Sequence, residues 1–265
     1  MTWIRRHLVI VIGLLVMAYI LLPNLVVLAY SFNKPNGRLN ITWQQFSLDA
    51  WLHPCNSPGI CTSVGLSLKI GIIASLTATV LGTLVAFALG RHRFRGRAGT
   101  NLLIFMPMAT PEVVMGSSLL TLFIALGVGT GQTTILIAHI MFCLSFVVVT
   151  VKARIASLDP RLEEAAADLY ANPLQAFRRV TFPLVAPGIA AGAMLAFSLS
   201  FDDYIITNFN ASPSSVTFPM YIWGAAQRGV PVQVNVIGSI MFLGAVAFVA
   251  FGQVLASRRE RAGTA

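Results

Sequence analysis

The sequence predicts an all-α protein that crosses a membrane six times. Of its 265 residues, 56% are hydrophobic and only 10% are charged, whereas soluble domains carry about 25% charged residues. The mean hydropathy is +0.78, and long apolar runs alternate with short polar segments. The net charge of +9 is compatible with nucleic-acid binding. In a membrane protein it more often reflects Lys and Arg retained on the cytoplasmic side, so we expect no nucleic-acid partner.

Six apolar runs are long enough to cross a bilayer, which takes about 20 residues of helix. They extend over about residues 8–32, 63–89, 101–126, 133–150, 184–206 and 236–255. The first run could instead be a signal peptide, but the apolar region of a signal peptide is typically about 7 to 15 residues long. The longer run here favours a retained span.

The distribution of basic residues predicts the orientation of these spans. With both termini in the cytoplasm, only Lys34, Arg38 and Arg228 of the 18 Lys and Arg residues fall in outer segments, and Lys69 lies within a span. This asymmetry is typical of a cytoplasmic N-terminus and C-terminus. We therefore expect a single domain with an external loop at 33–61, a transmembrane core at about 62–255 and a cytoplasmic tail at 256–265. The same reasoning makes the basic run 91–97 an orientation signal rather than a nucleic-acid patch.

The external loop contains two cysteines, Cys55 and Cys61. In an oxidising compartment they could form a disulfide that closes a small ring. Two free thiols are the alternative, and the sequence alone leaves both open.

A polar segment, 154–189, separates the fourth and fifth runs and carries four Arg and four acidic residues. Asp159 and Pro160 suit the start of a helix, and Asn172–Pro173 should end it. A second short helix should then lead to Pro183. This predicts a short cytoplasmic helix lying across the membrane face.

Glu164 and Asp168 are four residues apart, so they share one face of that helix. Two like charges on one face suit a partner that offers basic or donor groups. The alternative interpretation is a solvated amphipathic loop helix with no partner.

The spacing from Glu164-Ala165-Ala166 to Val180-Thr181-Phe182-Pro183 resembles the EAA loop of binding-protein-dependent ABC importer permeases. The resemblance implies a coupling helix that docks into a groove of a cytoplasmic ATPase. Tyr170 departs from the pattern, since the family usually has Gly there for the turn after the helix. The residues expected to couple to the ATPase are Glu164, Ala165, Ala166, Asp168, Leu169, Val180 and Pro183.

The resemblance extends over nearly the whole chain. The stretches RHRFRGR, MPMATPEVVMGSSLLTLF, FCLSFVVVTVKAR and LSFDDYIITNF are similar to spermidine/putrescine importer permeases, in particular the second of their two permease subunits. That family implies a type I importer in the bacterial cytoplasmic (inner) membrane. It also implies a sister permease, two ATPase subunits that bind ATP and Mg, and an extracytoplasmic substrate-binding protein, with no cofactor in this chain.

An ionisable residue inside a span is costly and is a functional candidate by default. Glu112 lies eleven residues into the third run, about 16 Å along a helix and close to the bilayer midplane. Pro107 and Pro111 loosen the backbone beside it. We expect Glu112 to face the substrate passage, with an internal partner such as His139 or a hydroxyl as the alternative.

Asp202 and Asp203 lie towards the outer end of the fifth run. On a continuous helix they point roughly 100° apart, so one should line the path and the other meet a loop or partner. Two acids at the water boundary are the alternative. Tyr204 and Trp223 could add cation–π contacts to an organic cation, although aromatic residues are ordinary at a membrane interface.

The sequence contains no GxxxxGK[ST] phosphate loop and no plausible catalytic constellation, so we expect a transport subunit rather than an enzyme. No second His or Cys lies at the spacing from His139 that metal ligands usually have. We therefore expect His139 to be a packed polar residue and not part of a metal site. An importer permease for another small solute and a secondary transporter are the alternative functions. A secondary transporter would usually need more spans or internal repeats, and a structural membrane protein would leave the EAA spacing unexplained.

Overall fold

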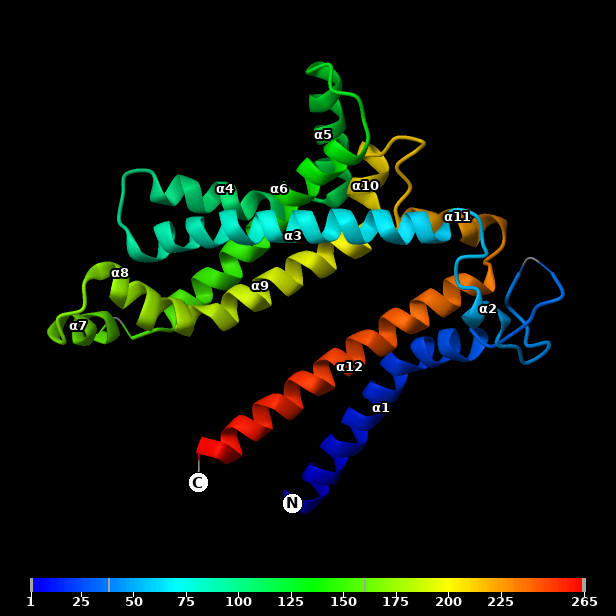
Figure 1. Ribbon diagram of the computed structural model, residues 1–265, viewed down its shortest axis with the longest axis horizontal. Coiled ribbons are helices and arrows are strands. Elements are labelled where there is room, and N and C mark those ends of the chain that lie inside the picture. The colour runs from blue at the N-terminus through cyan, green and yellow to red at the C-terminus, as the bar shows by residue number, and fades with distance from the viewer. Residues whose placement is uncertain (1, 38, 160, 264–265) are drawn as a thin grey trace. The chain divides into compact units, whose positions relative to one another are not determined.

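The computed structural model describes residues 2–37, 39–159 and 161–263 and is predominantly helical (Figure 1). Within these residues, five helices are long and apolar enough to span a membrane, and a bent helix pair makes a sixth if it is counted as one span. The predicted all-α class is therefore confirmed. The chain divides into two compact units, Met1–Cys61 with Ile222–Ala265, and Thr62–Tyr221.

The first unit is built on two long helices that lie side by side, α1 (Thr2–Tyr30) and α12 (Val232–Gly263) (Figure 1). A short helix, α2 (Asp49–Leu52), packs on α12 through a small core of Ala50, Val232 and Val236. Most apolar side chains of α1 are exposed. A helix that is apolar on all sides and buries little against protein suits lipid.

The second unit is centred on α6, which contributes eleven buried residues. Small residues allow close approach to it: a Cβ on Gly82 would lie 2.7 Å from Val147 Cγ1, and one on Gly188 would lie 2.6 Å from Arg154 Cβ. Such contacts are typical of packed membrane helices. The helices of this unit are α3 (Ile60–Arg91), α4 (Arg97–Ala109), α5 (Glu112–Ala125), α6 (Gln132–Ala156), α7 (Arg161–Asp168), α8 (Pro173–Ala176), the π-helix η1 (Phe177–Thr181), α9 (Phe182–Asp202) and α10 (Ile205–Asn210). One helix, α11 (Phe218–Arg228), begins in this unit and continues into the first unit from Ile222.

The third predicted span is not one continuous helix. It consists of α4 and α5, which are bent by 108° at Thr110 and Pro111. Pro111 has no N–H to donate and directs Thr110 to an extended conformation (φ −82°, ψ 131°). Pro111, which was expected only to loosen this span, therefore breaks it, whereas Pro107 lies inside α4.

The fifth predicted span differs from the structure at both ends. At its start, the predicted short helix before Pro183 is present as α8 and η1, but it runs without a gap into α9, so that one helical segment extends from Pro173 to Asp202. At its end, α9 stops at Asp202 and a new helix, α10, starts at Ile205. The stretch between the fifth and sixth predicted spans contains the helix α11.

Candidate functional site

The short cytoplasmic helix predicted from the sequence is α7. The Asp159 carboxylate accepts a hydrogen bond from the Arg161 amide at 3.0 Å, which satisfies a free donor at the helix start. Pro160, expected in the first turn, lies outside the described residues. The helix ends at Asp168.

The turn after α7 is made by Tyr170 in the left-handed conformation, with φ +60°. The Ala171 amide donates to the Ala166 carbonyl at 3.0 Å, and the Tyr170 amide donates to the Ala167 carbonyl at 2.9 Å. This pair of bonds is a Schellman motif, in which Gly usually occupies the left-handed position. Tyr170 thus makes the turn for which the family pattern has Gly.

The next helix starts immediately after this turn. The Asn172 carboxamide oxygen accepts from the Gln175 amide at 2.8 Å, and the Gln175 side chain accepts from the Asn172 amide at 3.0 Å. This reciprocal capping box fixes the entry to α8. The widened turn of η1 then leads into the first turn of α9, where Pro183 lacks the N–H that an ordinary turn would use.

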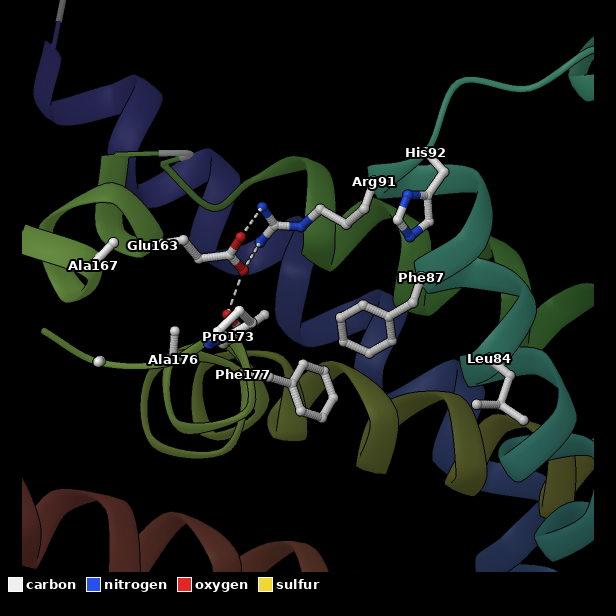
Figure 2. Close-up of a pocket in the computed structure, with 11 residues that line it drawn as sticks. Leu84, Phe87, Arg91, His92, Glu163, Ala167, Pro173, Ala176 and Phe177 are labelled. Atoms are coloured by element: carbon white, nitrogen blue, oxygen red, sulfur yellow. Dashed lines mark hydrogen bonds and ion pairs between the residues drawn. The ribbon is translucent and has the colours of Figure 1, made fainter.

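Glu163 ties α7 to two other elements, as Figure 2 shows. Its carboxylate pairs with both terminal nitrogens of Arg91, at 2.8 and 3.0 Å, and also accepts a hydrogen bond from the Thr181 hydroxyl. These groups lie beside a cavity of about 800 Å³. Its lining residues are Leu84, Phe87, Arg91, His92, Glu163, Ala167, Ala171, Pro173, Ala176, Phe177 and Thr181.

The opposite face of α7 is exposed. Glu164, Ala165 and Asp168 all face solvent, while Ala166 is buried beneath the helix. Leu169 and Tyr170 are 82% and 97% exposed. The hairpin therefore presents two carboxylates next to an apolar tip, a combination that suits docking to a partner. Farther along the chain, Val180 is half-buried and Pro183 exposed.

Glu112 occupies the first turn of α5, directly after the break, and is exposed. A carboxylate at this position is stabilised by the positive end of the helix dipole. The alternative partner His139 is engaged elsewhere, with Ser200, Thr207 and Asp203.

Asp203 is buried at the break between α9 and α10. Its carboxylate accepts hydrogen bonds from the Thr207 amide at 2.7 Å and the Thr207 hydroxyl at 2.8 Å. It also lies 3.3 Å from His139 Nε2, and His139 Nδ1 lies 2.7 Å from the Ser200 hydroxyl. The two acids are therefore separated by a helix end rather than by a rotation along one helix. His139 is a packed polar residue, in line with its prediction.

Asp202, at the end of α9, is exposed, and Tyr204 is half-buried in the break. Trp223 lies on α11 in the other unit and is 56% exposed. In the loop at 33–61, which is predicted to be external, Cys55 and Cys61 form a disulfide with a Cα–Cα distance of 5.4 Å.

Sequence reasoning missed the contacts of Arg91, Glu163 and Thr181. Arg91 was taken only as part of an orientation signal, and Glu163 was counted among the acids without a role. The three residues are separated by 72 and 18 positions, so no local pattern brings them together. The adjacent acids at the start of the helix could have indicated two different roles. Neighbouring residues on a helix point about 100° apart, so the two carboxylates meet different surroundings.

Comparison with known proteins agrees with this architecture. The family model described as "Binding-protein-dependent transport system inner membrane component" matches residues 78–261. The spermidine/putrescine transport system permease protein PotC of Escherichia coli K12 is 35% identical over 247 residues, 93% of each chain. The putrescine transport system permease protein PotI of the same organism is 38% identical over 249 residues, 91% of this chain and 88% of that protein.

A solved structure shares the fold. It is a bacterial ABC transporter involved in import of the acidic polysaccharide alginate, with a TM-score of 0.65 at 19% identity, covering 95% of this chain and 96% of that one. The family match, the two full-length relatives and the shared fold lead to one conclusion. The chain belongs to the family of binding-protein-dependent transport system inner membrane components.

Proposed function

We propose that this chain is the membrane-spanning subunit of an ATP-driven ABC importer that carries a polyamine, spermidine or putrescine, across the cytoplasmic membrane. The observation that carries the proposal is the full-length similarity to permeases named for spermidine/putrescine and putrescine transport. The exposed face of α7 supports it, because a subunit that does not itself hydrolyse ATP needs a docking element for one that does.

The proposed complex contains this chain, a sister permease, two cytoplasmic ATPase subunits and an extracytoplasmic binding protein. ATP and Mg bind to the ATPase subunits, since this sequence has no phosphate loop. Glu164 and Asp168 offer carboxylates to basic groups of the ATPase groove, and Leu169 fills an apolar part of it. Closure of the ATPase pair on ATP displaces α7, and the spans move from an inward-open to an outward-open arrangement.

The proposed substrate path uses the exposed acids. Glu112, at the break in the third span, and Asp202, at the end of α9, attract a polycation through Coulomb forces that strengthen away from bulk water. We assign Asp203 to holding the α9–α10 break, because its carboxylate is already engaged within the chain. Tyr204 and Trp223 are proposed to contribute cation–π contacts.

Uptake in vesicles tests this function. The chain is reconstituted with its sister permease, ATPase and binding protein, and uptake of labelled spermidine and putrescine is measured with ATP inside. We expect uptake to require both ATP and the binding protein. Unlabelled polyamine should compete with the labelled substrate, whereas an amino acid should not. Uptake driven by an ion gradient without ATP would instead identify a secondary transporter, and ATP-dependent uptake of an unrelated solute would overturn the polyamine assignment.

A further inference from the structure

A single carboxylate connects three elements on the side of α7 that faces away from the proposed docking surface. Glu163 is in the first turn of α7, Arg91 is the last residue of α3, and Thr181 is the last residue of η1, directly before α9. The Arg91 and Thr181 contacts meet at the two oxygens of Glu163. The coupling helix is thereby joined to the second and fifth spans at once.

The geometry of this junction is specific. Arg91 and Glu163 form two parallel N–H···O bonds, the arrangement that gives ion pairs both strength and a defined direction. The Arg91 charge also lies at the C-terminal end of α3, where the helix dipole favours a cation. The side chains are 26% and 39% exposed, so water weakens the pair without removing it.

The Arg91–Glu163 pair lies beside an open space between α7 and α3. Both residues line the cavity of about 800 Å³, so side chains do not fill this space. Within the described part of the chain, the Arg91–Glu163 pair is the polar side-chain link from α7 to α3. The edge-on contact of Phe87 with Phe177, at 5.4 Å between ring centres, joins α3 to η1 and leaves α7 out.

We propose that Glu163 is a positioning residue that transmits the displacement of α7 to the second and fifth spans through Arg91 and Thr181. The inference rests on the proposed function, since it requires that an ATPase moves α7. It assigns different tasks to neighbouring acids: Glu164 faces the ATPase, and Glu163 holds the helix to the spans. Loss of Glu163 should therefore leave ATPase binding intact and lower the yield of transport per ATP.

The test measures ATP hydrolysis and spermidine uptake in the same vesicles containing the full complex. In Glu163→Gln, ATPase subunits should co-purify as in the wild type and hydrolysis should persist, while spermidine imported per ATP falls about five- to tenfold, within the usual range of allosteric coupling. Arg91→Glu alone should have the same effect. The double variant Arg91→Glu/Glu163→Arg should recover part of the lost ratio, because it rebuilds the pair with reversed charges, although each new charge opposes the dipole of its helix.

Two control variants separate this inference from the docking proposal. Arg95→Gln removes an exposed charge near Arg91 and should keep the wild-type ratio. Glu164→Lys should instead lose the ATPase subunits during purification. Failure of the wild-type complex to couple uptake to ATP would refute the proposed function itself.

A wild-type ratio in Glu163→Gln, or a parallel fall in hydrolysis and uptake, would overturn the positioning role while leaving the proposed function standing. If Glu163→Gln does not accumulate, Thr181→Val supplies the same measurement with the ion pair intact. It should lower the ratio, and Thr181→Ser should restore it; an unchanged ratio in Thr181→Val would again overturn the inference.

Discussion

Tyr170 has an unusual backbone conformation for a residue with a large side chain. Left-handed geometry costs a non-glycine residue about 1–2 kcal/mol, and with the residue 97% exposed the ring recovers little of this through packing within the chain. The Schellman hydrogen bonds of Tyr170 and Ala171 hold the turn nevertheless. We expect this cost to be offset by a contact between the ring and a partner subunit.

Replacement of Tyr170 tests this conclusion. Tyr170→Gly should leave the free energy of unfolding unchanged or raise it by up to about 1 kcal/mol, because Gly adopts φ > 0 without steric cost. The melting temperature of the purified protein should follow. Tyr170→Val should lower it, since a β-branched residue fits this region poorly. Thermal unfolding in detergent gives both values, and a lower melting temperature for the Gly variant would show that the ring stabilises the chain itself.

Glu112 should matter for the substrate and not for the fold. Its side chain is exposed at the break between α4 and α5, so Glu112→Gln removes a charge without opening a cavity. We expect polyamine uptake to show a KM raised about tenfold, which corresponds to about 1.4 kcal/mol of lost attraction. Glu112→Asp keeps the charge and should stay close to the wild type, and an unchanged KM in Glu112→Gln would remove this residue from the path.

The adjacent acids of α7 show the limit of prediction at this scale. The sequence places Glu163 and Glu164 on a short polar helix and predicts that Glu164, with Asp168, meets a partner. What Glu163 contacts depends on how α7 is rotated against Arg91, a residue 72 positions away. Rotation of this kind is decided by tertiary contacts, so the role of Glu163 emerges only from the structure.

At the scale of elements, the contact between α3 and α6 depends on a residue without a side chain. A Cβ on Gly82 would meet Val147 Cγ1 at 2.7 Å and Val147 Cβ at 2.9 Å. Val147 is fully buried and β-branched, so it has little freedom to move. Close approach of the two helices is therefore sensitive to a single methyl group.

Two alanine substitutions on the same helix test that contact. Gly82→Ala should destabilise the protein by about 1–3 kcal/mol, the usual range for an overpacked core. Gly65→Ala, where no atom lies within 4 Å of the added carbon, should be neutral or stabilise by up to about 1 kcal/mol, because Ala is the better helix former. Melting temperatures in detergent compare the two, and equal values would contradict the packing argument.

The helix breaks divide into one that local sequence could have predicted and one that it could not. Pro111 removes a hydrogen-bond donor, and its effect on Thr110 is local, so the 108° bend was accessible from sequence. At the end of α9, Asp203 accepts local hydrogen bonds from the first turn of α10, but its contact with His139 comes from another helix and has no local sequence signal. Hydropathy averaged over a span-length window does not detect either break, because the segments on either side are predominantly apolar.

At the scale of the whole molecule, the chain is a multi-pass protein of the bacterial inner membrane, and its orientation remains a prediction from basic residues. We expect a phosphatase that is active only outside the cytoplasm to be active when fused within residues 33–61 and inactive when fused within residues 92–96. A fluorescent protein that folds in the cytoplasm should fluoresce at the C-terminus. The opposite pattern would reverse the assignment of every loop, including the placement of α7 beside an ATPase.

The redox state of Cys55 and Cys61 reports on which side of the membrane their loop was inserted. Cytoplasmic thiols are kept reduced, whereas extracytoplasmic ones are oxidised. A chain that delivers this loop to the outer side acquires a closed ring, and one inserted the wrong way round keeps two reactive thiols. Cys143 is buried, so alkylation of intact protein before and after reduction would count correctly inserted molecules without any added label.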